Sequence, residues 1–509
     1  MSRLQLENEN EAKIGPMMKF LNVVERVGNK LPHPFMLFVY LAAATMVFSA
    51  ILSFFNVSVF HPGTEEEVHI KSLISGEGLQ YITGSMVSNF SGFAPLGLVL
   101  TMMLGIGIAQ KVGLFEAFMK KTILNTPKSL VTYAVITAGV LGNLASDAAY
   151  IIIPPLAAMV FYAIGRHPFA GLAAGFAGVG AGFTANFIVA GTDALLSGIS
   201  TEVAKTVDPT VIVTPVDNYF FMSASVVMLV IVGALVTEKI IEPRLGTYTG
   251  KAIDTTFEVT KEETKALRRT GIAAVAYLGL LAMVVLPASS PLRAEDGGLV
   301  PSPFISGIVP IILFFFITLA IVYGASVGKI KNTSDVPTLM GEAMKDMSGY
   351  IVLVFAVAQF IAYFNWSNIG IWMAVSFADL LQSVNMTGLP VIIGFILLTA
   401  ILNLFIISGS AQWALMAPVF IPMFMIMGYD PAFVQLGFRI ADSSTNIISP
   451  LNPYIPMLLM FMKDYDKKAG FGTLFSLMLP FSIFFLGAWI VLLIIWVLVG
   501  LPIGPGITM

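Results

Sequence analysis

Two stretches decide how this chain folds: residues 145–168 read ASDAAYIIIPPLAAMVFYAIGRHP, and residues 409–431 read GSAQWALMAPVFIPMFMIMGYDP. In each, a serine (Ser146 or Ser410) stands eight residues before a proline, and a Gly-x-x-Pro step follows. Each serine belongs to a polar tip between two apolar blocks, which are shorter than the roughly 20 residues of a spanning helix. We therefore predict two re-entrant hairpins, at 130–165 and 390–427.

The composition of the 509 residues excludes a soluble protein. Hydrophobic residues make up 57% of the chain and charged residues 11%, whereas soluble domains carry about 25% charged residues. Apolar blocks recur along nearly the whole length, with room for about ten or more spanning helices. The sequence predicts an all-α polytopic membrane protein.

Several function classes are disfavoured by what the sequence lacks. The net charge of −3 gives no basic field for nucleic acid. Without cysteine, and with four scattered histidines, the chain has no disulfide, thiolate site or histidine metal motif. It has no Walker A, HExxH or GxSxG motif, which argues against ATP-driven transport and most enzyme chemistry. The glycines at 178–182 indicate close helix packing rather than a nucleotide fingerprint.

Basic residues in the loops indicate the side of the membrane on which each loop lies. They crowd residues 1–30 and 240–270 and flank both ends of the first hairpin, whereas the second hairpin has none at its ends. This pattern predicts nine transmembrane helices and two oppositely oriented hairpins, with a cytoplasmic N-terminus and no cleaved signal peptide. A plain count of eleven or thirteen spans is the alternative, and it places some basic loops outside.

Matching motifs in the two halves lie about 260 residues apart, as in LPHPF at 31–35 and VPSPF at 300–304. With hairpins opening to opposite sides, this offset predicts an inverted repeat, the architecture of secondary transporters with a binding site near the midplane. Scaffold and transport parts are then interleaved in sequence. The predicted parts are a cytoplasmic N-terminal segment (1–30), a first repeat (31–239), a cytoplasmic linker (240–270) and a second repeat (271–500).

The helix after each hairpin is predicted to be interrupted, at 168–190 by glycines and at 431–460 by prolines. Irregular backbone at membrane depth persists only where it is buried in protein or lines a wet cavity. We therefore expect a functional site at these two interruptions.

Ionisable residues at membrane depth are costly and usually functional. Arg439 and Asp442 are three residues apart, share a helix face and are predicted to form an ion pair. The pair serves either to lock the helix in place or as a substrate or proton site. Asp193 is a further candidate, with a position in an external loop as its alternative.

The hairpin tips supply candidate ligands for a cation. The Asp147 carboxylate, the Ser146 hydroxyl and freed carbonyl oxygens suit Na⁺, and helix capping by Asp147 is the alternative. The second tip comprises Ser408, Gly409 and Ser410. Just past it, Trp413 either stacks on an aromatic ligand or packs in the interior, and Asn403 either bridges helices or contacts a ligand or ion.

Motifs along nearly the whole chain resemble the AbgT family of p-aminobenzoyl-glutamate transporters. They include NFSGFAPLG (89–97), SDAA (146–149), GFTAN (182–186), LSGISTE (196–202), EPRLG (242–246), FNWSN (364–368) and FRIADSS (438–444). The resemblance implies a homodimer in the bacterial inner membrane, with nine spans and two opposed hairpins, that carries p-aminobenzoyl-glutamate or sulfonamide antimetabolites by H⁺ or Na⁺ coupling. Import and export both stay open.

The resemblance also implies the functional positions. These are Asp193, Trp413, Pro431, Arg439, Asp442 and Pro450, with Asn403, Asp442, Asn186 and Asn446 as candidate Na⁺ ligands. No cofactor other than a bound Na⁺ is expected. Arg439 and the hairpin helix N-termini suit the glutamate carboxylates, and Trp413 suits the ring. In this elevator-type carrier the hairpin-bearing domain moves against a fixed dimer scaffold. The alternatives are a Na⁺-coupled carrier of other dicarboxylates and a passive channel.

Overall fold

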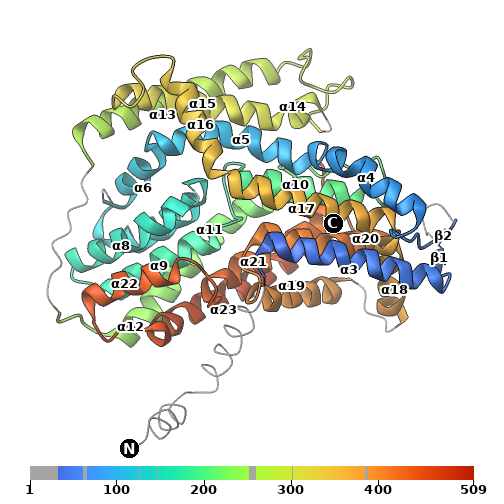
Figure 1. Ribbon diagram of the computed structural model, residues 1–509. Helices are drawn as coiled ribbons and strands as arrows, with labels where there is room; N and C mark the ends of the chain where they lie inside the picture. The colour runs from blue at the N-terminus through green and yellow to red at the C-terminus, as the bar shows by residue number, and fades with distance from the viewer. Residues whose placement is uncertain are drawn as a thin grey trace, which may run out of the picture.

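The computed structural model describes residues 32–60, 66–124, 126–145, 147–250, 259–300, 302–383 and 388–508. Within these ranges the chain is helical apart from one small β-hairpin and an isolated bridge (Figure 1). Strands β1 (Ser58–Phe60) and β2 (Glu67–His69) pair antiparallel. The predicted all-α fold is confirmed, whereas the predicted cytoplasmic segment 1–30 lies outside the described residues.

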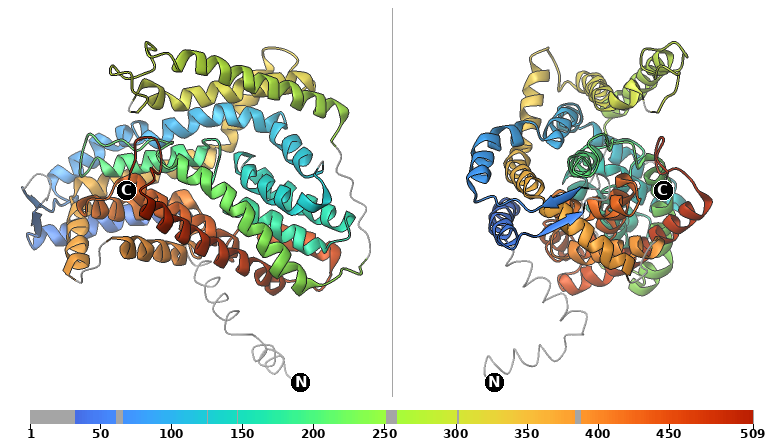
Figure 2. Two further views of the ribbon diagram at one scale, coloured as in Figure 1. Left: turned by 180° about the vertical axis from the view of Figure 1, so that it is seen from behind. Right: turned by 90° about the vertical axis from the view of Figure 1, so that its right-hand side faces the viewer.

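A first group of helices packs around α5 and α17. Its members are α3 (Pro34–Phe54), α4 (Gly76–Ser91), α5 (Ala94–Lys111), α13 (Lys261–Val285), α14 (Pro303–Ser306), α15 (Ile308–Ser326), α16 (Asp335–Asp346) and α17 (Ser348–Trp366). Helices α15 and α16 pack on α5, α3 and α4 pack on α17, and α13 packs on α15. Helices α13 and α15 form an outer layer along one side of the molecule (Figure 2).

A second group contains both predicted hairpins and both interrupted helices. Its members are α7 (Val131–Gly142), α8 (Asp147–Ala163), α9 (Pro168–Ala181), α10 (Gly191–Ala204), α11 (Tyr219–Val236), α19 (Leu389–Asn403), α20 (Gly409–Ile426), α21 (Pro431–Thr445), α22 (Ile455–Tyr465) and α23 (Phe471–Val499). It meets the first group where α10 packs on α5 and where α20 contacts α17. Helix α18 (Ile369–Ser383) packs on α20 and contacts α17.

Short elements complete the described chain. They are α6 (Leu114–Leu124), α12 (Glu242–Leu245), the 3₁₀ turns η1 (Lys128–Leu130), η2 (Asn143–Ala145) and η4 (Asn446–Ile448), and the π-helix η3 (Thr237–Ile241). Helix α6 bridges the two groups, because it contacts α5, α13 and α15 on one side and α7 and α8 on the other.

Helix lengths and compositions agree with a multi-pass membrane protein. Among the described residues, eight helical segments are long and apolar enough to cross a membrane, and five shorter helices are apolar. The shorter ones include α7, α8, α9 and α19. Proline at the first helical position, where no backbone donor is needed, begins α3, α9 and α21.

The glycines of α9 let it pack closely against the first hairpin, as the sequence indicated. Gly182 is the tightest case, since an added Cβ would lie 2.3 Å from Val140 Cα. Backbone is in contact with backbone here, so no side-chain movement can make room for a larger residue. The interruption after α9 is thereby held against the end of α7.

Candidate functional site

Both predicted helix interruptions are present and lie against each other. Residues 182–190 between α9 and α10 are not helical, and α21 is followed by η4 and then by extended backbone at Ser449. The extended conformation at Ser449 is required by Pro450, which excludes the α conformation of the residue before it. The Thr184 and Ser443 hydroxyls lie 2.6 Å apart, and Asn446 Nδ2 donates to Gly180 O at 2.9 Å.

A buried ion pair joins the two interrupted helices. The Arg439 guanidinium, 1% exposed, pairs through one terminal nitrogen with Asp193 Oδ1. The same nitrogen donates to Thr184 O at 2.8 Å, and the other donates to Asn218 Oδ1 at 3.3 Å. Asp193 Oδ2 accepts from the backbone N–H of Ala190 at 2.6 Å. Each charge is therefore compensated inside the protein, which a buried pair requires.

Two expectations about these charges are wrong. The predicted Arg439–Asp442 ion pair is not formed, because Arg439 extends toward the N-terminus of α10, whereas Asp442 borders the second hairpin tip. Residues three apart on a helix are neighbours, but their side chains diverge when different helices pack against each. The alternative position of Asp193 in a loop is also wrong, since it is a buried residue of the first turn of α10.

Three residues at or near the end of α21 and the end of α19 carry buried side-chain oxygen atoms that accept no hydrogen bond from the described residues. Within the described part of the chain, Asp442 Oδ2, Asn446 Oδ1 and Asn403 Oδ1 are buried and have no hydrogen-bond partner. Asn403 Nδ2 donates to Asp442 O at 2.8 Å and to Thr445 Oγ1 at 3.0 Å, so it bridges α19 and α21. Carboxylate and amide oxygens left free in this way fit a hard cation such as Na⁺.

The fourth candidate Na⁺ ligand, Asn186, lies in the other interruption. Its Oδ1 accepts from Asn143 Nδ2 at 3.4 Å, and its Nδ2 has no partner among the described residues. No hydrogen bond in the described chain joins it to Asn403, Asp442 or Asn446. The described residues contain no cluster of three His, Cys, Asp or Glu side chains that could hold a metal ion.

The second hairpin tip and α10 both direct helix N-termini at the interior. Ser408 caps α20 by accepting from Ala411 N–H at 3.4 Å, and its hydroxyl lies 3.2 Å from that of Ser410. Thr192 lies in the first turn of α10. The N-terminal end of a helix attracts anions through its free N–H groups and its dipole. At the first tip, Ser146 and the side chain of Asp147 lie outside what the structure describes.

Two adjoining cavities of about 360 and 480 Å³ occupy the space between these elements. Both lie within the range of small-molecule sites. They share the lining residues Tyr150, Phe183, Thr192, Leu195 and Ser410. The first also touches Asp442, Asn446 and the rest of the second tip, and the second reaches Asn143 and Leu144 at the end of the first hairpin helix. We call the two together the central chamber.

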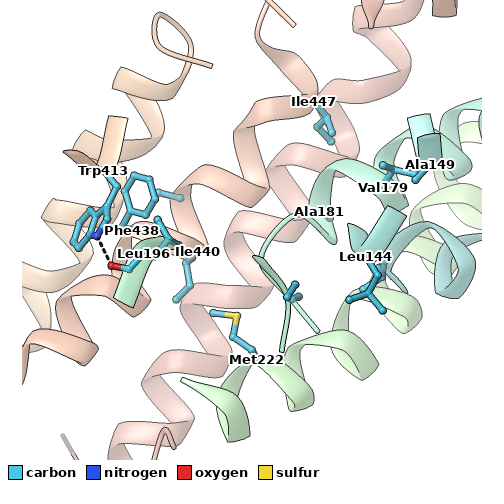
Figure 3. Packing of buried hydrophobic residues seen from close by; sticks show 14 of the residues in the cluster. Leu144, Ala149, Val179, Ala181, Leu196, Met222, Trp413, Phe438, Ile440 and Ile447 are labelled. Carbon is cyan, nitrogen blue, oxygen red and sulfur yellow. Dashed lines mark hydrogen bonds between the residues drawn. The ribbon is translucent and has the colours of Figure 1, made fainter. Parts of the chain in front are cut away.

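Trp413 does not line the central chamber. It is fully buried, its Nε1 donates to Ser200 Oγ at 3.1 Å and to Leu196 O at 3.3 Å, and its ring lies 4.7 Å from that of Phe438 (Figure 3). Of the two interpretations, the structure favours interior packing. Phe438, which stands between Trp413 and the chamber, supplies an aromatic face instead.

The two proline candidates lie away from the chamber. Pro431 begins α21 next to the capping residue Asp430, eleven residues and about 16 Å of helix before Asp442. Pro450 forces the turn after η4, and residues 452–454 beyond it line the chamber. Their geometry indicates that they shape the interrupted helix rather than contact a ligand.

Sequence reasoning missed two features of the site. Tyr150 and Tyr454 stack with ring centroids 4.3 Å apart and line the chamber. Asn143 donates to Phe183 O in the first interruption, and Asn403 donates to Asp442 O in the last turn of α21, just before the second interruption. The signal for Asn143 was available, because the pair Asn-Leu at 143–144 recurs at 403–404, near the offset of the other matches.

Interrupted helices that meet at an internal chamber, in a chain with many apolar helices, define a membrane transporter. The chain belongs to the AbgT putative transporter family, whose profile matches residues 19–509. It is 46% identical over 490 residues to the p-aminobenzoyl-glutamate transport protein of Escherichia coli K12, with 96% of each chain covered.

Solved structures agree with this family assignment. The Alcanivorax borkumensis YdaH transporter has a TM-score of 0.89 at 40% identity, covering 93% of this chain and 100% of its own. MtrF of Neisseria gonorrhoeae, described as illuminating a class of antimetabolite efflux pumps, has a TM-score of 0.90 at 42% identity, covering 96% and 100%. Family and relatives are transporters, which confirms the expectation of a multi-pass transporter rather than an enzyme.

Proposed function

We propose that this protein is a secondary transporter of p-aminobenzoyl-glutamate or sulfonamide-type antimetabolites in the bacterial inner membrane, driven by H⁺ or Na⁺. The observation that carries the proposal is the buried Arg439–Asp193 pair beside a chamber edged by free oxygens and two helix N-termini. A substrate with carboxylates and an aromatic ring matches the N-termini and the rings of Phe438, Tyr150 and Tyr454. The relatives' described substrates agree.

We place the coupling ion at Asp442. Asp442, Asn403 and Asn446 would hold Na⁺ through their free oxygens, and a proton on Asp442 would serve the same purpose in a proton-coupled carrier. Asn186 lies outside this set. A cation there supplies positive charge beside the second hairpin tip, so substrate carboxylates and the cation favour each other's binding.

The mechanism we propose is of the elevator type. Nine spans and two hairpins entering from opposite sides form inverted repeats, with the N-terminus in the cytoplasm, and two copies associate through the first helix group. The similar roles of Asn143 and Asn403 support the repeat. The second helix group then carries the chamber across the membrane against the fixed first group.

Flux into liposomes containing the purified full chain tests the function. Radiolabelled p-aminobenzoyl-glutamate and a sulfonamide are each measured with the Na⁺ and pH gradients varied independently, and succinate is added as competitor. Saturable flux that follows one gradient supports the proposal. Flux that is independent of both gradients and does not saturate would indicate a channel, and competition by succinate a general dicarboxylate carrier.

A further inference from the structure

A separate apolar cavity of about 550 Å³ lies between the two helix groups. One wall comes from α6, α13 and α15, and the other from the tip of the first hairpin and Ile188 in the first interruption. Four phenylalanines dominate the lining: Phe115, Phe118, Phe315 and Phe316. Nothing in the proposed transport cycle assigns a role to this cavity.

The cavity is open on the side that faces the bilayer. Phe118 and Ile188 on its rim are 45% and 37% exposed. Helix α13 supplies part of one wall. Only 11% of its most apolar stretch is buried in the protein, and Ile272 and Val275 on it are exposed. The rim at Phe118 and Ile188 lies outside the first helix group, through which two copies are proposed to associate. In a membrane this rim is in contact with hydrocarbon, so an acyl chain has direct access.

One end of the cavity carries a positive charge without a counter-charge. Lys121 lines the cavity in the last turn of α6, and among the described residues it forms no salt bridge. Its neighbour Lys120 pairs with Glu116 at 2.6 Å. Lysine and arginine near a membrane surface attract anionic lipid headgroups.

We propose that this cavity binds one anionic phospholipid, with an acyl chain among the phenylalanines and the phosphate at Lys121. The positive charge of Lys121 complements the phosphate and favours an anionic lipid over a neutral apolar molecule. The site spans both helix groups, and Leu144 at the hairpin tip lines this cavity and the central chamber alike. The end of the acyl chain is therefore expected to adjoin Leu144, which lines both the lipid site and the transport chamber.

Gly271 provides a clean way to fill the cavity. It lines the cavity, and a Cβ added there meets no heavy atom within 4 Å. Gly279 on the same helix is equally unobstructed and does not line the cavity, so it is the matched control. Gly271→Phe and Gly279→Phe are compared, with Ala274→Leu as a second cavity-lining variant in case Gly271→Phe reduces the yield of folded protein.

Native mass spectrometry of the full chain, incubated with phosphatidylglycerol or with phosphatidylcholine of the same acyl chains, gives the test. Wild type and Gly279→Phe retain phosphatidylglycerol, and Gly271→Phe or Ala274→Leu binds it about tenfold less tightly, since losing two buried methylenes is enough for that. Equal retention by Gly271→Phe and Gly279→Phe overturns the proposal.

A second arm tests the headgroup. Lys121→Glu lowers the preference for phosphatidylglycerol over phosphatidylcholine about tenfold, because it reverses a charge at the phosphate. Lys331→Glu, a surface lysine away from the cavity, leaves the preference unchanged. An unchanged preference in Lys121→Glu overturns the headgroup assignment. Displacement of the lipid signal by a sulfonamide at equal concentration identifies an apolar drug site instead.

Discussion

Arg439 on α21 and Asp193 at the start of α10 form a buried ion pair that connects the two interrupted helices. The partners lie 246 positions apart in the chain, so the pair exists only when both repeats have folded against each other. Removing one partner of such a buried pair destabilises a protein strongly, whereas replacing both partners changes the stability much less.

Removing one member of the pair should destabilise the protein strongly. Asp193→Ala and Arg439→Ala each leave a buried charge uncompensated, at a cost of about 3–5 kcal/mol. The double variant Asp193→Asn with Arg439→Gln should lose much less, because neither charge is left. Thermal unfolding in detergent measures these variants together with the single variants Asp193→Asn and Arg439→Gln, and additive effects of those two singles in the double variant would contradict a direct pair. Under conditions in which Arg439→Ala stays folded, we expect coupled transport to be abolished.

Asp442→Asn should abolish gradient-driven transport while leaving the protein folded. The amide takes up no proton and weakens the attraction for Na⁺, but it is close to the carboxylate in size. Asp430→Asn, at the other end of the same helix, keeps its capping oxygen and should transport normally. Liposome flux is measured for both variants. A wild-type rate in Asp442→Asn would show that this carboxylate has a structural role and does not take part in coupling.

Variants of Phe438 and Trp413 should distinguish a ring that binds the ligand from a ring that only packs in the interior. Phe438→Leu removes an aromatic face of the chamber and should raise KM for an aminobenzoyl substrate about tenfold, from lost ring contact. Trp413→Phe loses two hydrogen bonds inside the protein and should cost about 1–2 kcal/mol of stability with little change in KM. The reverse pattern in flux and unfolding measurements would make Trp413 the ligand-binding ring.

Asp217 should make stability fall as pH rises. It precedes α11, outside the apolar span, and burial raises its pKa from 3.8 to about 6, with nearby Asp430 adding repulsion. The folded protein therefore holds this proton more tightly than the unfolded chain. The stabilisation is complete below pH 3.8 and is lost as pH rises through about 6, an effect of about 2–3 kcal/mol.

Asp217→Asn should flatten this dependence. Unfolding midpoints between pH 4 and pH 7, measured side by side with Asp208→Asn in the same loop, give the comparison. A slope in Asp217→Asn equal to that of wild type would assign the pH dependence to other groups.

Gly182→Ala should interfere with assembly of the first interruption. The new Cβ would lie 2.3 Å from Val140 Cα, so α7 and α9 must separate, at a cost of about 1–3 kcal/mol or more. Gly84→Ala on α4, where nothing lies within 4 Å, should be neutral. Size-exclusion chromatography and thermal unfolding compare the two variants, and equal stability of Gly182→Ala and Gly84→Ala would contradict the close contact.

Local patterns predicted much of this fold, because membrane helices consist of runs of apolar residues and because glycine and proline mark the places where these helices are interrupted. The helices α7, α8 and α20 lie within the predicted hairpin ranges, and α19 begins one residue before its range. The partner of Arg439 could not be found in this way, since Asp442 is close in sequence and Asp193 is close only in space. The burial of Trp413 likewise depends on α10, which packs on α20 from far along the chain.

The first hairpin is anchored at its base. Arg166, just after α8, makes a bidentate contact with Glu242 at 2.6 and 2.8 Å, and Thr132 at the start of α7 donates to Glu238 at 2.7 Å. Both glutamates lie at the end of α11, in and directly after the π-helix η3. No ion pair in the described chain ties the second hairpin in a comparable way. The base of the first hairpin is therefore fixed to the end of α11, and we expect the second hairpin to be the more easily displaced of the two.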